Sequence, residues 1–359
     1  MGLGLGGFAA TFGVAVAATF LLRRLAWRLG WVDVPGGRKQ HESLVPPVGG
    51  LSIGLAVLIG ILVVADAGTV DASILPLLAC LFSLVALGAI DDFRGLSARL
   101  RLLAHVAAAL LLVLWGDLRI TTLGTFLGAE VELGLLAIPV TVVCVVGFIN
   151  ALNMFDGIDG LAGGFSLVCL LWLAIAAQVD AGGTGVGLLL LFAAGVAGFL
   201  LFNLRHRFRR RATVFLGDAG STMLAVVIAW YAIKIGGSGE GAIPPLSYAW
   251  LLVLPVMDMI SLTMRRIRRG HSPLQADREH VHHVFMRAGY SPSETAYILL
   301  GATAVLGSFG LIAGLAGVPQ TVQALGLLIV FGLHHYFITR AWRTMKVLKR
   351  MRGPRRSNA

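Results

Sequence analysis

The chain is predicted to be an all-α polytopic membrane protein with about eleven transmembrane helices, a periplasmic N-terminus and a cytoplasmic C-terminus. Three observations predict this class: 57% hydrophobic residues, only 13% charged residues and a mean hydropathy of +0.85. A soluble domain carries roughly 25% charged residues. The three cysteines all lie inside apolar runs, so neither a disulfide framework nor a metal-thiolate site is expected.

The predicted spans are apolar runs that approach or exceed the length needed to cross a bilayer as a helix, about 17 to 25 residues. The first is expected to be retained, because Arg23 and Arg24 follow it and no basic residue precedes it, the reverse of a signal peptide. Residues 1–339 are expected to form one membrane domain and 340–359 a basic cytoplasmic tail. The eleven runs lie near residues 3–22, 48–66, 72–90, 100–115, 133–149, 161–179, 184–202, 219–236, 245–264, 294–315 and 320–338.

Lysine and arginine predict the orientation, because cytoplasmic loops retain these residues. With the N-terminus outside, all of the 29 Lys and Arg residues fall on the cytoplasmic side except Arg119 and Lys234. The net charge of +11 therefore indicates topology and attraction to lipid phosphates, and no nucleic-acid partner is expected. On the other side, the segment 117–133 predicts a small periplasmic hairpin.

Acidic residues collect at the cytoplasmic ends of the predicted spans. Carboxylates at a lipid boundary are costly unless they are paired or hold a cation, so this grouping predicts a polar site with a metal. A solvated helix-end pair would explain the first two alone, but it would not explain the later acidic loops. The grouped residues are Asp91 and Asp92 after the third span, Asp156 and Asp159 after the fifth, and Asp218 before the eighth.

The segment 150–161 is the most specific motif. Asn150 and Asn153 are three residues apart, as are Asp156 and Asp159, so a helical approach would place each pair on one face. Glycines beside them allow the backbone to approach a ligand closely. A calcium EF-hand is not expected because its closing glutamate is absent. A plain turn would leave two amides and two carboxylates without a role.

Asp218 has glycines on both sides, and Ser221 is a candidate helix cap. A carboxylate at a helix N-terminus can simply stabilise the helix. The same position suits a carboxylate that holds Mg²⁺ bridged to a diphosphate, because this ion prefers one or two protein carboxylates plus phosphate oxygens. Both interpretations can hold together.

The last cytoplasmic loop, residues 265–283, combines arginines with a histidine cluster, His280, His282 and His283. The basic run alone would be an ordinary membrane anchor, and the histidines alone would be compatible with zinc. No cysteine lies nearby and the spacing is not that of a metalloprotease helix. Recognition of a phosphate or a sugar is therefore favoured over zinc.

The order of these motifs resembles the polyprenyl-phosphate N-acetylhexosamine-1-phosphate transferases. That family is similar to this chain in four cytoplasmic motifs, between about residues 90 and 285. The His-x-His-His form of the last motif resembles the branch that uses undecaprenyl phosphate and N-acetylglucosamine. The MurNAc-pentapeptide branch usually has three consecutive histidines instead. The four matching motifs are Asp91-Asp92, the Asn-x-x-Asn-x-x-Asp-Gly-x-Asp-Gly segment at 150–160, Gly217-Asp218-x-Gly220-Ser221 and Asp277-Arg278-x-His280-x-His282-His283.

The resemblance implies transfer of N-acetylglucosamine 1-phosphate from UDP-GlcNAc to undecaprenyl phosphate, at the cytoplasmic face of the bacterial inner membrane. This reaction would initiate a cell-surface polysaccharide such as O-antigen. Mg²⁺ is the implied cofactor, with Mn²⁺ as the alternative ion, and membrane lipids are further partners; a homodimer is compatible with it. The implied roles are catalytic for Asp91, Asp92, Asp156 and Asp159, substrate-binding for Asn150, Asn153, Arg278, His280, His282 and His283, and metal-binding for Asp218 and Asn153.

Other functions agree less well with these motifs. The same reaction with a GalNAc, FucNAc or MurNAc-pentapeptide donor stays open. A CDP-alcohol phosphotransferase is disfavoured because its Asp-Gly-x-x-Ala-Arg signature is absent. A secondary transporter would place acidic groups near the bilayer midplane within internal repeats. No repeat is visible, and Asp258 is the only acidic residue well inside the inner half of a span.

Overall fold

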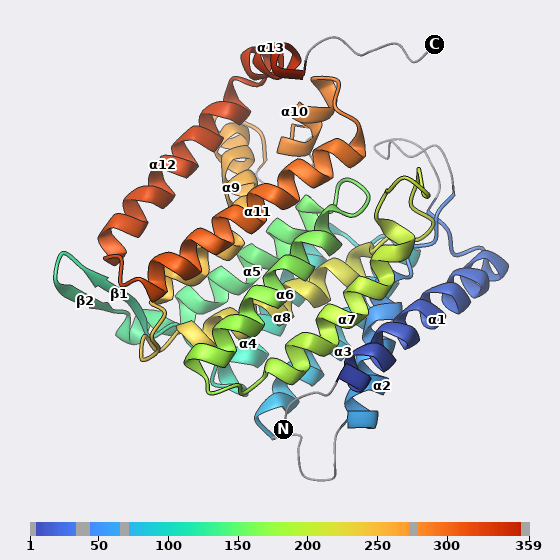
Figure 1. Cartoon of the computed structure of the whole chain (residues 1–359), viewed down its shortest axis with the longest axis horizontal. Coiled ribbons are helices and arrows are strands. Elements are labelled where there is room, and N and C mark those ends of the chain that lie inside the picture. The colour runs from blue at the N-terminus through green and yellow to red at the C-terminus, as the bar shows by residue number, and fades with distance from the viewer. Residues whose placement is uncertain (1–4, 34–43, 65–71, 273–278, 353–359) are drawn as a thin grey trace.

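The computed structural model describes residues 5–33, 44–64, 72–272 and 279–352, and helices dominate these parts of the chain (Figure 1). Eleven helices coincide with the predicted runs. Two more, α10 (Val281–Arg287) and α13 (Ala341–Arg352), lie outside those runs. The eleven are α1 (Leu5–Leu29), α2 (Gly49–Val64), α3 (Leu75–Arg94), α4 (Ala98–Leu114), α5 (Ala137–Phe155), α6 (Leu161–Asp180), α7 (Val186–Asn203), α8 (Gly217–Gly236), α9 (Pro245–Arg268), α11 (Pro292–Leu315) and α12 (Gln320–Thr339).

The predicted class, an all-α polytopic membrane protein, is confirmed. Within the described residues, nine helices are long and apolar enough to cross a membrane. The remaining two of the eleven, α2 and α4, are the shortest, with 16 and 17 residues. The number of eleven crossings, the orientation, the division at residue 340 and a homodimer all stay predictions.

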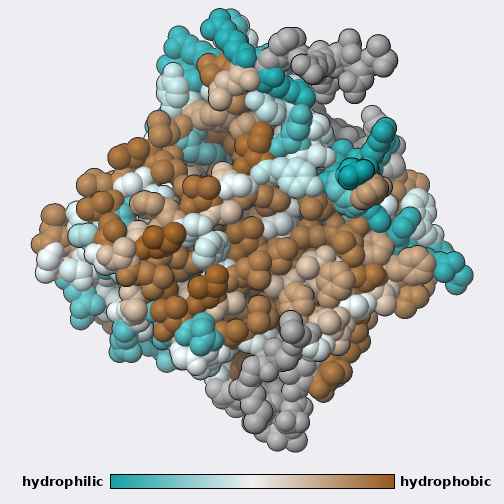
Figure 2. Space-filling view, viewed as in Figure 1, coloured by the Kyte–Doolittle hydropathy of each residue, from teal (hydrophilic) through white to brown (hydrophobic). Residues whose placement is uncertain are grey.

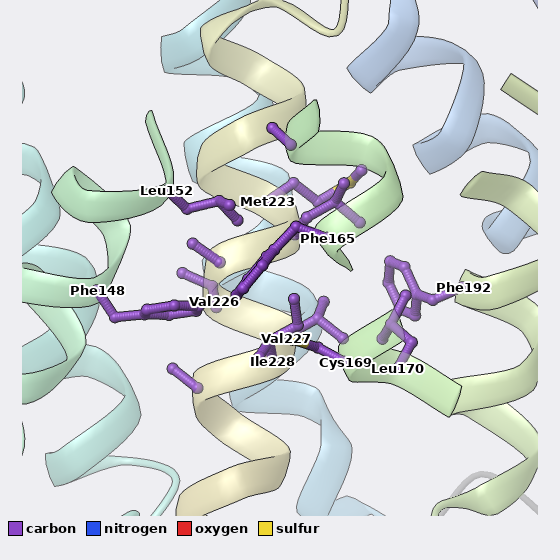
Figure 3. Packing of buried hydrophobic residues seen from close by; sticks show 14 of the residues in the cluster. Phe148, Leu152, Phe165, Cys169, Leu170, Phe192, Met223, Val226, Val227 and Ile228 are labelled. Atoms are coloured by element: carbon purple, nitrogen blue, oxygen red, sulfur yellow. The ribbon is translucent and has the colours of Figure 1, made fainter. Parts of the chain in front are cut away.

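Helix α8 is the centre of the bundle. It packs against α2, α3, α5 and α6, and nearly all of its side chains are buried. Phe148 of α5 and Phe165 of α6 lie against its middle turns, whereas Phe192 of α7 lies farther from it (Figure 3). At its first turn, glycines let two neighbours approach closely. A Cβ added at Gly88 of α3 would lie 2.4 Å from Cα of Ala219, and one added at Gly50 of α2 would lie 2.3 Å from the backbone nitrogen of Gly220. The start of α8 is therefore held firmly among the ends of other helices.

The two ends of the bundle differ. A two-stranded antiparallel sheet, β1 (Thr122–Phe126) and β2 (Ala129–Glu132), lies at one end, as the segment 117–133 predicted. Its turn is tied to α12, where the hydroxyl of Thr321 accepts the Leu127 N–H at 3.0 Å. The opposite end carries α10 and α13 (Figure 1). An apolar belt crosses the molecule between polar surface at that end and smaller polar patches around the sheet (Figure 2).

Candidate active site

Four helix ends meet opposite the β-sheet and bring the acidic motifs together. Asp91 and Asp92 lie in the last turn of α3, and Asn153 in the last turn of α5. Asp218 lies in the first turn of α8, which packs against both helices. We call Asp91, Asp92, Asn153 and Asp218, together with Arg101 from the first turns of α4, the carboxylate cluster.

Arg101 joins two of the carboxylates. Its Nη1 atom lies 3.2 Å from Oδ2 of Asp91 and 3.1 Å from Oδ2 of Asp218. The Arg101 side chain is 37% exposed, so solvent weakens each ion pair, but one guanidinium still offsets the repulsion between two carboxylates. Sequence reasoning counted Arg101 only as a basic residue of a cytoplasmic loop. Its place ten residues after Asp91, at the start of the next helix, was the available signal.

Asp91 and Asp92 point in different directions, as expected for neighbours in a helix. Oδ1 of Asp91 accepts the Leu96 N–H at 2.5 Å, which holds the turn after α3. Asp92 instead accepts the backbone N–H groups of Asp218 at 2.9 Å and Ala219 at 3.4 Å. Asp92 therefore satisfies N–H groups at the start of α8, where helices leave them without a partner in their own helix.

The prediction that Ser221 caps α8 is wrong. The helix begins at Gly217, so Ser221 lies beyond its first turn, where its hydroxyl donates to the carbonyl of Asp218 at 3.4 Å. Gly217 has φ +75°, and a Cβ there would lie 2.6 Å from Oδ2 of Asp92. Glycine at this position thus makes room for the carboxylate of another helix to take the capping role.

Asp92→Ala is expected to destabilise the protein by about 1 kcal/mol, the usual cost of removing a side chain that caps a helix N-terminus. Thermal unfolding of the detergent-purified protein measures this loss. Asp117→Asn is the control, because Asp117 is 79% exposed, pairs with the exposed Arg119 at the other end of the bundle, and has a φ of +47° that asparagine tolerates. Equal midpoints for the two variants would contradict a capping role for Asp92.

The two predicted asparagines separate. Nδ2 of Asn153 donates to Oδ1 of Asp218 at 2.7 Å and to the hydroxyl of Ser221 at 3.0 Å. Asn150 donates instead to the carbonyl of Val146 in its own helix at 2.7 Å. Asn153 therefore belongs to the carboxylate cluster, whereas no hydrogen bond described here links Asn150 to it.

The donor set suits Mg²⁺. Asp218 offers a carboxylate, and Asn153, whose Nδ2 faces that carboxylate, would offer its amide oxygen after a turn of the amide. Mg²⁺ takes one or two such ligands and completes its shell with phosphate and water. Among the described residues, no group of three or more His, Cys, Asp or Glu side chains is arranged to hold a metal ion.

The loop after α5 holds the other two aspartates, which have different surroundings. Oδ2 of Asp159 accepts from Nε of Arg205 at 2.6 Å and from the Ala212 N–H at 3.0 Å, so it anchors the Arg-rich loop between α7 and α8. The pKa of Asp156 is raised to about 7, mainly by burial and in addition by the negative charges of Asp218 and Asp159. Asp156 can therefore gain or lose a proton near neutral pH.

The histidine cluster lies against this same loop. The rings of His280 and His282 are stacked with their centroids 5.4 Å apart, and the centroids of the His282 and His283 rings are 4.3 Å apart. A Cβ at Gly157 would lie 2.2 Å from Nε2 of His282, so the ring touches the residue next to Asp156. The histidine cluster therefore contacts, at Gly157, the loop that directly follows Asn153 of the carboxylate cluster.

Within the histidine cluster, His282 is the residue whose ring nitrogens are best suited to bind a ligand. Its side chain is 1% exposed, and neither ring nitrogen has a hydrogen-bond partner among the described residues. Burial lowers the pKa of His282 well below 6.5, and the neighbouring His283 and His280 lower it further. The ring is thus neutral at pH 7, with one donor and one acceptor nitrogen for a ligand. Arg278, the remaining predicted substrate-binding residue, lies outside the described residues.

The fold and site together define a multi-pass membrane protein with a polar, phosphate-compatible site at one end of its helices. Residues 74–236 match the sequence model of the family described as "Glycosyl transferase family 4". Undecaprenyl-phosphate alpha-N-acetylglucosaminyl 1-phosphate transferase of Escherichia coli strain K12 is 35% identical over 344 residues, covering 94% of this chain and 92% of the relative. The protein with the same name from Haemophilus influenzae is 32% identical over 350 residues, covering 95% and 96%.

A third relative with this name, from Yersinia pestis, is 34% identical over 346 residues, again covering 94% of this chain and 92% of the relative. The chain belongs to the family of polyprenyl-phosphate N-acetylhexosamine-1-phosphate transferases. The resemblance drawn from the four motifs is thereby confirmed, and so is the membrane setting. The roles of the individual site residues stay predictions.

Proposed function

We propose that the protein transfers N-acetylglucosamine 1-phosphate from UDP-GlcNAc to undecaprenyl phosphate, giving undecaprenyl-diphospho-GlcNAc and UMP. The observation that carries this proposal is that one segment of chain joins motifs far apart in the sequence: Asn153 is bonded to Asp218 of the carboxylate cluster, and Gly157 is in contact with His282 of the histidine cluster. The relatives' names favour GlcNAc over the GalNAc, FucNAc and MurNAc-pentapeptide alternatives. The product would initiate a cell-surface polysaccharide.

The acceptor needs little activation. A phosphate monoester has a second pKa near 6, so it is largely dianionic at neutral pH. The protein must mainly neutralise two mutually repelling phosphate groups and align the acceptor with the leaving UMP. Mg²⁺, or Mn²⁺ in its place, would be held by Asp218 and Asn153 and would supply charge neutralisation. Arg101 contributes a fixed positive charge beside the same carboxylates.

Asp91 and Asp156 are the two candidates to take a residual proton from the acceptor. Both oxygens of Asp91 already accept hydrogen bonds, from the Leu96 N–H and from Arg101, so Asp91 is better suited to orient groups than to exchange protons. Asp156, with its pKa near 7, matches the operating pH of a general base. His282, a neutral ring with no hydrogen-bond partner in the part of the chain that the structure describes, is suited to bind the sugar diphosphate.

Asp156→Asn is expected to change the pH profile of turnover. If deprotonated Asp156 accepts the proton, wild-type activity rises with pH through about 7, where that carboxyl ionises. The asparagine variant should be slower and should keep only the rise near pH 6 that belongs to the acceptor phosphate. Initial rates of the wild type and the variant, measured from pH 5 to 9 at saturating substrate concentrations, test this prediction. An unchanged limb near pH 7 in the variant would reject the base role.

The reaction itself is tested with purified protein, undecaprenyl phosphate, Mg²⁺ and a panel of radiolabelled UDP-sugars, scored for label in the lipid fraction. UDP-GlcNAc should label the lipid and release UMP, and chelation of the divalent ion should stop the transfer. Labelling from UDP-GalNAc or UDP-MurNAc-pentapeptide in its place would change the assigned donor. No transfer from any donor would overturn the proposed function.

We also propose that the site faces the cytoplasm of a bacterial inner membrane, because nearly all basic residues lie at that end of the helices. Arg207→Cys near the site and Thr184→Cys in the turn between α6 and α7 are matched exposed probes. In a variant without the three native cysteines, an impermeant maleimide should label Thr184→Cys in cells whose outer membrane alone is permeabilised. Arg207→Cys should react only after the inner membrane is opened. The reverse pattern would invert the topology.

A further inference from the structure

Asp258 is a buried carboxylate that accepts hydrogen bonds from two consecutive residues, His280 and Val281. The side chain lies within α9 and is 2% exposed. Its Oδ2 atom is 2.7 Å from Nδ1 of His280, and Oδ1 accepts the Val281 N–H at 3.0 Å. Nε2 of His334, on α12, approaches Oδ1 at 3.5 Å. Asp258 thus grips the residue before α10 and the first residue of that helix.

A second residue of α9 holds the same segment. Arg265 lies seven residues after Asp258, so two helical turns place both side chains on one face of α9. Arg265 forms an ion pair with Glu279, directly before His280. Two anchors of opposite charge therefore bind consecutive residues, 279 and 280, and fix the direction in which the chain enters α10.

The anchored segment leads directly to the candidate donor site. The His280 ring stacks on the His282 ring with an interplanar angle of 5°. The His282 ring in turn lies against Gly157, in the loop that follows Asn153 of the carboxylate cluster. A shift of His280 would therefore move His282 relative to residues 156–160.

We propose that Asp258 is a positioning residue for donor binding, which acts by holding His280 and the start of α10 so that His282 stays against residues 156–160. This inference rests on the proposed function. Because an ionised carboxylate only accepts hydrogen bonds, it keeps a proton on Nδ1 of His280 and leaves Nε2 as the ring nitrogen open to a ligand. The arrangement matches the way outer carboxylates orient histidines that bind metals.

Asp258→Asn tests the proposal with little change in shape. The amide can still accept from Val281 N–H, but its NH₂ group would face Nδ1 of His280 and force the ring to rotate or to move its proton to Nε2. We expect KM for UDP-GlcNAc to rise at least about tenfold, with KM for undecaprenyl phosphate unchanged. Asp258→Glu, which keeps the charge, should recover part of the donor affinity.

A double-mutant cycle separates positioning from general stability. If Asp258 acts through His280, adding Asp258→Asn to His280→Ala should change KM by less than about threefold, because coupled residues are not additive. Independent effects would multiply. Asp180→Asn is the matched control: Asp180 also accepts two backbone N–H groups and the Tyr248 hydroxyl, but at the opposite end of the bundle. Its donor KM should equal that of the wild type.

The outcomes are distinct. Multiplicative KM changes, an equal rise in KM for both substrates, or a failure of both Asp258 variants to fold would each overturn the positioning role. A wild-type enzyme that transfers no sugar phosphate under the same conditions would instead remove the proposed function. A donor-specific KM rise in Asp258→Asn, absent from the His280→Ala background, would support the inference.

Discussion

Asp218→Asn is expected to lower turnover at least about a hundredfold, a loss of about 2.7 kcal/mol of transition-state stabilisation. Asparagine keeps the shape of the side chain but removes the charge and one of the two oxygens. Asp218 faces Arg101 with Oδ2 and Asn153 with Oδ1, and it is the carboxylate proposed to hold Mg²⁺. Initial rates over a range of Mg²⁺ concentrations measure the effect, and raised Mg²⁺ should restore little activity.

The variant should still fold, because the capping bonds of α8 go to the backbone N–H groups of Asp218 and Ala219 and not to the Asp218 side chain. Asp180→Asn provides the comparison, since it removes a carboxylate that is hydrogen-bonded near the β-sheet, far from the site. That control should keep wild-type turnover. Near wild-type turnover in Asp218→Asn would place the metal elsewhere.

The fold was largely predictable because lipid imposes one simple requirement. Each apolar run must satisfy its backbone within a helix, so the eleven runs and the eleven helices coincide. The ends were less predictable. Helix α1 continues to Leu29 and α9 to Arg268, several residues past the apolar runs, because arginine side chains can reach the headgroup region while the helix goes on. Hydropathy reports the thickness of lipid and not the length of a helix.

The site was predictable in its members but not in their partners. Asp91, Asp156, Asp218 and the histidines stand out because charge is rare at a lipid boundary. Arg101 does not, because a basic residue at the cytoplasmic end of a span is expected for topology alone. Asp258, noted in the sequence only as a lone acidic residue inside a span, proves to be bonded to His280. Such pairs depend on how helices pack, which spacing along one chain does not report.

Arg101→Ala is expected to have two effects of opposite direction. Turnover should fall about a hundredfold or more, as when a fixed donor to developing charge is removed. The Mg²⁺ concentration for half-maximal activity should nevertheless decrease. The guanidinium competes with a cation for Asp218, and its removal leaves the charges of Asp91 and Asp218 uncompensated. Rates measured against Mg²⁺ concentration give both quantities from one data set.

Two further variants sharpen this prediction. Arg101→Lys keeps the charge but lacks the planar fork that lets Arg101 face two carboxylates, so it should recover only part of the turnover. Arg99→Ala removes an exposed arginine two residues away, for which no polar contact is described, and should behave as wild type. An increase in the half-maximal Mg²⁺ concentration with Arg101→Ala would mean that the guanidinium helps to hold the bound phosphates together with the ion. Unchanged turnover would reduce the Asp91–Arg101–Asp218 bridge to a feature of the substrate-free protein, since the chemistry would then proceed without it.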